Sequence, residues 1–413
     1  MKSLILNTSD LWGGAHIATY RLHRGLINQG VDSTMYVQKK VSDDNTVNGP
    51  SEKYNILYGN FRPYIDNIPN IFYKKRIKEK FSSAILPNRS VTHAFDTRYD
   101  ILHLFWVTDG FMRIESLKKV NNPVVWTLHD MWPFTGGCHY DNDCGKYIEK
   151  CGTCPTLGSA SKNDISRKVW ERKFKSWKNL NLTIVATSEW LAKCARNSSL
   201  FGDLRIEVIP NGIDTERYKP IDKKTSREVY NLPVDKKLIL FASLSPTKDK
   251  RKGFQFLRPA INKLKQDGAL NDVELVIVGT SKPELPLDLD IKVHFIPRLY
   301  DELSQVLLYS AADITILPSI QENLSNTVIE SMACGTPVIA FDIGGMPDMI
   351  KHEFNGYLAK PFDVDSLSNG ITWILNNLES KKISDNAREY AVTNYKIETV
   401  SGKYFKLYQD ILK

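Results

Sequence analysis

Short apolar runs alternate with helix-like patterns along this chain of 413 residues, and this alternation most constrains its fold. Segments of this length, separated by amphipathic stretches, indicate buried parallel strands joined by crossover helices. The sequence therefore predicts an α/β fold with doubly wound sheets. In the N-terminal half the runs are Lys2 to Ser9, 33–38, Asp100 to Trp106, Pro123 to Asp130 and Leu182 to Ser188.

The same alternation restarts after the turn-like segment "VIPNGID" at 208–214. We expect two Rossmann-like domains, an N-terminal one at 1–207 and a C-terminal one at 208–395. Ligands bind outside the carboxyl ends of such strands, which predicts a site in a deep cleft between facing domains. The amphipathic tail at 396–413 is expected to form a helix that packs back on the N-terminal domain.

The composition excludes several classes of protein. With 42% hydrophobic and 25% charged residues, the chain should form a packed core. Its net charge of +8 is too dispersed to indicate a nucleic-acid partner. No apolar run approaches the roughly 18–20 residues that span a bilayer, and the N-terminus lacks the pattern of a signal peptide. These features predict a cytoplasmic protein.

One segment, 61–90, is locally basic and contains interleaved aromatic residues. Tyr73, Ile77 and Phe81 recur at every fourth position, which is close to helical spacing. The segment is either a solvated helix face or a patch that lies on the anionic lipid of a membrane.

Two carboxylates, Glu322 and Glu330, lie on either side of an expected helix start. Eight helical residues rise about 12 Å, so the two acids should not form a contacting acid/base pair. Ser325, Asn326 or Thr327 is expected to cap the helix, and free N–H groups there form an anion site. A diphosphate with hydroxyl-bearing groups at both ends would suit this arrangement. The simpler interpretation is a helix-dipole acid and an unrelated surface glutamate.

Several stretches in order resemble the retaining glycosyltransferases of family 4, which have the GT-B fold. They cover essentially the whole chain: "SDLWGGA", "WTLHD", "ATSEWLA", "VIPNGIDTERYKP", "DKRKGF", "NGYLAKPFD" and the segment 312–350 that contains both glutamates and "ACGTPVIA". The resemblance implies two Rossmann-like domains that face each other across a cleft.

The resemblance also implies roles at the matched positions. Glu322 would contact the hydroxyls of a donor sugar, Lys252 would neutralise the departing diphosphate, and His129 would lie near the reacting sugar. These three are the candidate catalytic residues. The candidate donor-binding residues are Gly13, Gly14, Arg251, Lys252, Ser325, Asn326, Thr327 and Glu330. No catalytic metal or cofactor is implied, because the lysine and helix amides neutralise the diphosphate.

One departure from the family concerns a second cation at the phosphates. The family often has an arginine in a "GRL" triplet, where this chain reads "ASLSPTKDKRKG". Ser243 or Ser245 stands near the arginine position, and Arg251 or Lys248 is the candidate replacement.

Four cysteines form a cluster with the spacing C-x5-C-x6-C-x2-C in the loop 138–154. Closely spaced cysteines in a cytosolic chain favour a metal over disulfides, and four thiolates suit a structural zinc ion. His139 could replace one thiol, and the alternatives to zinc are reduced free thiols or redox pairs. The candidate ligands are Cys138, Cys144, Cys151 and Cys154.

The implied activity is transfer of a sugar from a UDP- or GDP-type nucleotide sugar to a hydroxyl of a glycan. The chain is similar to enzymes of bacterial surface-polysaccharide assembly (O-antigen, capsule or exopolysaccharide), which implies a lipid-linked oligosaccharide acceptor at the inner face of the membrane. Two alternatives stay open, a nucleotide-sugar 2-epimerase of the same architecture and a non-catalytic sugar-nucleotide or glycan-binding scaffold. An NAD-linked dehydrogenase is disfavoured, since Gly13 and Gly14 do not complete a G-x-G-x-x-G motif.

Overall fold

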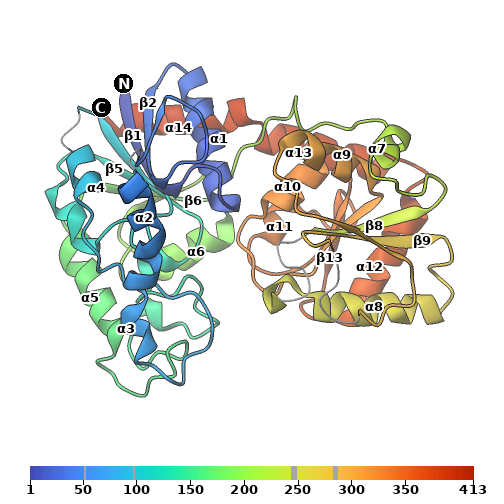
Figure 1. Cartoon of the computed structure of the whole chain (residues 1–413), viewed down its shortest axis with the longest axis horizontal. Coiled ribbons are helices and arrows are strands. Elements are labelled where there is room, and N and C mark those ends of the chain that lie inside the picture. Colours follow the sequence, from blue (N-terminus) through green and yellow to red (C-terminus); the bar gives the residue numbers. More distant parts are fainter. Residues whose placement is uncertain (51–52, 96–97, 243–248, 282–286) are drawn as a thin grey trace. The chain divides into compact units, whose positions relative to one another are not determined.

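The computed structural model describes residues 1–50, 53–95, 98–242, 249–281 and 287–413, with the backbone alone at 53–55. This chain divides into two compact units (Figure 1). The first unit contains Met1–Asn211 and Val400–Lys413, and the second contains Gly212–Thr399.

Within the described residues, seven parallel strands form the sheet of the first unit, in the order β3-β2-β1-β4-β5-β6-β7. The strand order reverses between β1 and β4, and Ser3 of β1 pairs with both Ser33 and Ile101. The strands are β1 (Lys2–Ser9), β2 (Asp32–Lys39), β3 (Val47–Asn48), β4 (Ile101–Leu104), β5 (Val124–Leu128), β6 (Leu182–Ala186) and β7 (Arg205–Val208).

The second unit contains a parallel sheet of six described strands, in the order β10-β9-β8-β11-β12-β13. Here the order reverses between β8 and β11. The strands are β8 (Lys237–Ala242), β9 (Val273–Val278), β10 (Val293–Ile296), β11 (Ile314–Leu317), β12 (Val338–Phe341) and β13 (Gly356–Ala359). Two doubly wound sheets confirm the predicted α/β class.

Helices cover both faces of each sheet. In the first unit they are α1 (Gly14–Asn28), α2 (Lys53–Asp66), α3 (Ile68–Ile71), α4 (Arg89–Ala94), η1 (Ile114–Lys119), η2 (Trp132–Phe134), η3 (Lys146–Ile148), α5 (Ile165–Trp177) and α6 (Glu189–Asn197). Those that follow are α7 (Lys223–Val229), η4 (Lys250–Lys252), α8 (Phe254–Gln266), α9 (Glu302–Ala311), α10 (Asn326–Ala333), α11 (Met346–Met349), α12 (Val364–Asn377), α13 (Lys382–Tyr395) and α14 (Ile397–Ile411). Among all the described residues, no helix is both long enough and apolar enough to cross a bilayer.

The strands are apolar on both faces because both faces are buried. In β1, Leu4 and Leu6 belong to the core on one side of the sheet, and Ile5 belongs to the core on the other side. In β8, Leu240 and Ile239 divide between the two cores of the second unit in the same way. Alternate side chains point to opposite faces of a strand, so a strand covered on both sides needs a continuous apolar run.

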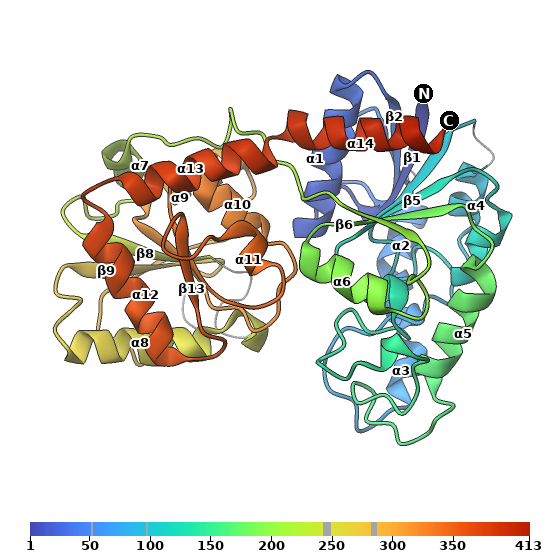
Figure 2. The ribbon, with the colours of Figure 1, turned by 180° about the vertical axis from the view of Figure 1, so that it is seen from behind.

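Helix α14 completes one core of the first unit (Figure 2). Its buried side chains include Val400, Tyr404 and Tyr408, which join a cluster with Ile5 of β1. The Tyr408 hydroxyl lies 2.6 Å from Nδ1 of the buried His103, and the Tyr404 hydroxyl lies 3.0 Å from that of Thr127. The C-terminal segment of the chain therefore belongs to the packing of the N-terminal sheet.

The helical spacing predicted at 73–81 is wrong. This segment contains turns, and long-range hydrogen bonds determine its path. The Tyr73 hydroxyl accepts a hydrogen bond from the Ile165 N–H at 2.9 Å, and the Ile77 N–H donates to the Thr156 carbonyl at 3.0 Å. Contacts with Thr156 and Ile165, which follow the cysteine loop in sequence, thus override a local periodicity of only three residues.

Candidate functional site

The reversal of strand order in the second unit places several predicted site residues together. Strand β8 is hydrogen-bonded to β11, although β9 and β10 follow it in sequence. The helix η4 follows β8, and residues 318–325 connect β11 to α10. A reversal in an open parallel sheet forms a crevice at the carboxyl ends of the strands, where ligands bind.

Gly253 allows close approach of the two segments that follow these strands. Its φ angle is +78°, and a Cβ atom there would lie 1.6 Å from the Pro318 carbonyl oxygen. The Ile320 N–H also donates a hydrogen bond of 2.8 Å to the Arg251 carbonyl. Glycine is required because any other residue would collide with the backbone after β11.

Lys252 and Glu322 form an ion pair at this place. The Lys252 Nζ lies 3.2 Å from Oε2 of Glu322, and their side chains are 27% and 18% exposed. A partly exposed pair can exchange partners with a ligand, whereas a fully buried one cannot. The structure therefore brings together two of the three predicted catalytic residues.

Helix α10 begins beside this pair. Ser325 occupies the N-cap position, and Asn326 and Thr327 form the first turn. The Ile329 N–H donates to the Ser325 carbonyl at 3.3 Å, so the preceding N–H groups lie before the first helical hydrogen bond. This end of a helix has a partial positive charge and favours anions. The predicted helix start between the two glutamates is confirmed.

Glu330 is fixed inside the protein one turn further along α10. Its side chain belongs to a residue only 7% exposed, and it accepts a hydrogen bond of 3.0 Å from the Tyr309 hydroxyl. Burial and the neighbouring carboxylate raise the pKa of Tyr309 well above its ordinary value, so Tyr309 remains a donor. The two glutamates differ in environment, since Glu322 is partly exposed and Glu330 is buried.

Arg251 is one candidate for the second cation that would contact the phosphates. Arg251 is half exposed and donates from Nη2 to Asp249 at 2.8 Å. Ser243, Ser245 and Lys248 lie outside the described residues.

In the first unit, predicted residues also follow strands at the reversal of order. Gly13 has a φ angle of +107° and precedes α1, which begins at Gly14. In the first turn of α1, Nδ1 of His16 lies 3.1 Å from Oδ1 of the buried Asn7. The Trp106 N–H, after β4, donates to the same oxygen at 3.1 Å. Asn7 thus connects the ends of the two strands that flank the reversal.

His129 follows β5 and lies close to this group. Its ring centroid is 5.9 Å from that of Phe105. Burial lowers the pKa of His129 to about 4, although Asp130 opposes the shift. Burial and the neighbouring His129 lower the pKa of His16 to about 3. Both imidazoles are therefore neutral at pH 7.

Sequence reasoning missed a buried network around Asp130. Oδ2 of this carboxylate lies 2.7 Å from Nδ1 of His139 and accepts a hydrogen bond of 2.7 Å from Nε1 of Trp106. Burial opposes ionisation, but His139 and Trp106 hold the pKa of Asp130 below its ordinary value. His139 also contacts the Ser82 hydroxyl at 2.9 Å. The adjacent His129 and Asp130 were a signal in the sequence, but their partners are distant in it.

Comparisons with known proteins agree with this geometry. Residues 12–217 match the family described as Glycosyltransferase Family 4, and residues 222–390 match Glycosyl transferases group 1. A D-inositol 3-phosphate glycosyltransferase from Acidothermus cellulolyticus is 30% identical over 335 residues, which are 76% of this chain and 68% of the relative. The chain belongs to glycosyltransferase family 4.

Other relatives of this family 4 chain align over shorter lengths. UDP-Gal:alpha-D-GlcNAc-diphosphoundecaprenol alpha-1,3-galactosyltransferase from Escherichia coli is 24% identical over 216 residues, 51% of this chain and 55% of that protein. The chain spans about half the length of the first curated relatives that it matches. The structure of sucrose-phosphate synthase from Thermosynechococcus elongatus superimposes with a TM-score of 0.69 at 19% identity, covering 99% of this chain and 98% of that one. The fold is GT-B.

The cysteine loop of this family 4 chain does not assemble a four-thiol site. Cys138 and Cys154 lie with their sulfur atoms 3.9 Å apart, while the Cys151 sulfur accepts a hydrogen bond from the Gly136 N–H at 3.1 Å. Across the described ranges, no group of three or more His, Cys, Asp or Glu side chains could hold a metal ion. The predicted zinc ligands are thus near one another in sequence but are not arranged around one centre.

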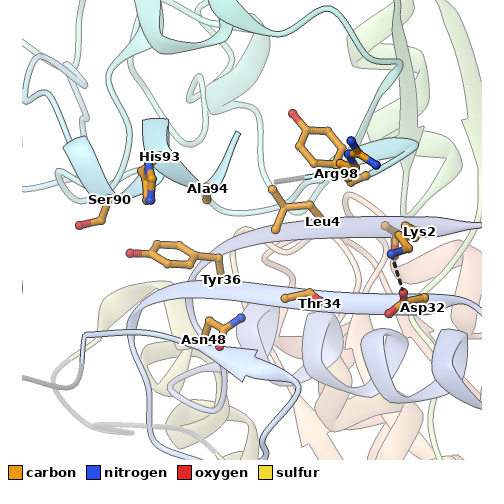
Figure 3. Close-up of a pocket in the computed structure, with 12 residues that line it drawn as sticks. Lys2, Leu4, Asp32, Thr34, Tyr36, Asn48, Ser90, His93, Ala94 and Arg98 are labelled. Carbon is orange, nitrogen blue, oxygen red and sulfur yellow. Dashed lines mark ion pairs between the residues drawn. The ribbon is translucent and has the colours of Figure 1, made fainter. Parts of the chain in front are cut away.

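A separate cavity of about 540 Å³ lies beside the first parts of β1 and β2. Figure 3 shows Lys2 and Asp32 at one end of it, 3.6 Å apart, and Tyr36 and His93 toward the other. Its lining contains none of the predicted site residues. The cavity is therefore distinct from the candidate site.

Proposed function

We propose that this chain is a retaining glycosyltransferase that transfers a sugar from a UDP-sugar to a hydroxyl of a lipid-linked glycan. The observation that carries the proposal is the Lys252–Glu322 pair, 3.2 Å apart, next to the N-terminus of α10. A cation, a helix end and two carboxylates in different environments are the groups that a sugar diphosphate requires.

When the donor binds, Lys252 and Glu322 are proposed to separate from each other, and each is proposed to contact the donor instead. The diphosphate would take the Lys252 ammonium and the amides near Ser325, and Glu322 would then accept hydrogen bonds from sugar hydroxyls. Glu330, oriented by Tyr309, would accept those of the ribose. UDP is favoured because the Escherichia coli relative is named for a UDP-sugar.

In the proposed reaction, the bond between the anomeric carbon and the diphosphate oxygen breaks as the acceptor oxygen bonds to that carbon on the same face. The acceptor proton passes to the leaving phosphate oxygen. Negative charge grows on the diphosphate, and Lys252 with the helix end stabilises it. The neutral His129 and the Asp130 network are proposed to line the acceptor side in the first unit.

The acceptor is proposed to be an undecaprenyl-diphosphate-linked sugar of a bacterial surface polysaccharide, by analogy with the same relative's name. UDP release is measured from UDP-sugars with and without alpha-D-GlcNAc-diphosphoundecaprenol and other lipid-linked sugars. Release that depends on acceptor supports the proposal. An epimerised sugar nucleotide formed without acceptor, or UDP binding with no turnover on any acceptor, contradicts it.

Lys252→Ala tests the chemical role of the ion pair. Removing one preorganised charge at a developing anion lowers kcat roughly a hundredfold to a thousandfold. Lys250→Ala is the matched control, since Lys250 is an exposed lysine of the same short helix η4. Equal kcat values for the two variants would remove Lys252 from the mechanism.

A further inference from the structure

Helix α2 and the short α3 have their polar and apolar faces reversed relative to an ordinary surface helix. Arg62, Asp66 and Asn70 point into the protein and are at most 4% exposed. The large apolar side chains on the other side are exposed, from 46% for Ile68 to 80% for Phe72. They are Leu57, Phe61, Tyr64, Ile68, Ile71 and Phe72, and we refer to them as the apolar stripe.

Specific hydrogen bonds hold the polar face inward. Nε of Arg62 donates to the Gly110 carbonyl at 2.7 Å. The Asp66 carboxylate accepts hydrogen bonds from the N–H groups of Ala84 and Ile85 at 3.1 and 2.8 Å. A buried charged group is tolerated only when it is paired in this way. The helix therefore cannot rotate to bury its apolar stripe without losing these contacts.

The apolar stripe extends from α2 through α3 to Phe72, the residue after α3. From Leu57 to Ile71 its residues recur at intervals of three or four, the spacing of one helix face, and Phe72 follows Ile71 directly. Figure 1 shows α3 following directly after α2 along the same side of the unit. A group of large exposed apolar side chains of this kind indicates an interaction site.

A basic segment continues from the end of the stripe. Lys74, Lys75 and Lys78 are exposed, and within the described chain none of the three forms an ion pair with a carboxylate. An apolar helix face with adjacent lysines is the arrangement by which a protein lies in the surface of an anionic bilayer. A two-fold contact with a second copy would instead bring like charges together at the same patch.

We propose that the apolar stripe and these lysines form a membrane-docking surface for anionic phospholipid. The apolar side chains enter the boundary between headgroups and acyl chains, and the lysines contact the phosphates. The proposal does not depend on the donor site, because docking requires no nucleotide sugar.

The experiment is co-sedimentation of the full chain with vesicles of equal parts phosphatidylglycerol and phosphatidylcholine, and with phosphatidylcholine alone. We expect binding to the anionic vesicles that weakens as salt is raised. Phe61→Ser with Tyr64→Ser should weaken it by about tenfold or more. Lys74→Gln with Lys75→Gln should weaken it by about tenfold on anionic vesicles.

Matched controls alter similar groups elsewhere. Val229→Ser with Val234→Ser changes side chains of similar exposure in the second unit, and Lys118→Gln with Lys119→Gln changes exposed lysines of η1. Both should leave binding unchanged, and thermal melting should show that all variants fold. Equal loss in the controls, or absence of vesicle binding, overturns the proposal. Concentration-dependent self-association that Phe61→Ser with Tyr64→Ser abolishes would also overturn it, and would assign the stripe to a contact between copies.

Discussion

At the scale of single residues, the candidate site depends on charges whose partners come from distant parts of the chain. Lys252 and Glu322 are 70 positions apart, and Glu330 takes its donor from Tyr309 on another helix. In the first unit, Asp130 is surrounded by His139 and Trp106. Each carboxylate is held by specific partners, so these contacts define orientation more than they add stability.

The buried histidines predict a loss of stability in mild acid. The pKa of His16 is lowered from 6.5 to about 3 in the folded chain, so the unfolded chain binds more protons below pH 6.5. The stabilising contribution is complete above pH 6.5 and decreases as pH falls toward 3. At pH 5 the loss is about 2 kcal/mol for this residue.

This prediction is checked by urea unfolding at pH 7 and pH 5. His16→Gln should reduce the difference in unfolding free energy between the two pH values. His352→Gln is the control, since His352 is half exposed. A pH dependence that is unchanged by His16→Gln would contradict the prediction.

At the scale of elements, the turn between η4 and α8 positions Lys252. Gly253 meets the Pro318 carbonyl at a distance that allows no Cβ atom. Gly253→Ala should therefore displace η4 from the loop after β11 and weaken UDP binding as well as stability. Gly268→Ala is the control that separates backbone strain from the collision with Pro318. Its φ of +73° is similar, but a Cβ there would meet nothing within 4 Å in the described structure. Calorimetric Kd values for UDP provide the measurement, and an equal Kd in both variants would refute the positioning role.

Helix α14 is expected to be essential for the first unit. Tyr404 is 2% exposed and packs against the sheet, so Tyr404→Ala should cost about 3–5 kcal/mol of unfolding free energy. Lys406→Ala, at an exposed position of the same helix, should change it by less than about 0.5 kcal/mol. Denaturant unfolding measures both. Similar values for the two variants would show that the helix does not stabilise the sheet.

At the scale of the whole molecule, the two units separate the proposed tasks. Lys252, Glu322 and Glu330 all lie in the second unit, and His129 with the Asp130 network lies in the first. Two compact units need not unfold as one, so two thermal transitions are expected. The membrane-docking surface belongs to the first unit alone.

Ligand binding should distinguish these transitions. UDP at a hundred times its Kd stabilises a folded site by about 2.7 kcal/mol, so one transition should move upward in scanning calorimetry. Tyr404→Ala should lower the other transition. Glu330→Gln should abolish the shift by UDP without altering the response to Tyr404→Ala. A UDP-induced shift that persists in Glu330→Gln would place the nucleotide elsewhere.

The sequence by itself determined the features that depend on neighbouring residues. Continuous apolar runs predicted strands buried on both faces, and the residues at 325–327 predicted the start of α10 between Glu322 and Glu330. The local signal at 73–81 failed because only three residues carried it and tertiary hydrogen bonds outweighed it.

Only the tertiary structure decided the contacts between distant segments. The sheet order puts β8 next to β11, which brings Lys252 to Glu322, and hydrophobic periodicity contains no information about strand order. The sequence also did not predict which face of α2 is exposed. The buried partners of Arg62 and Asp66 lie on later loops of the chain. Periodicity reports which side chains share a face, whereas the partners available in the folded chain decide which face is buried.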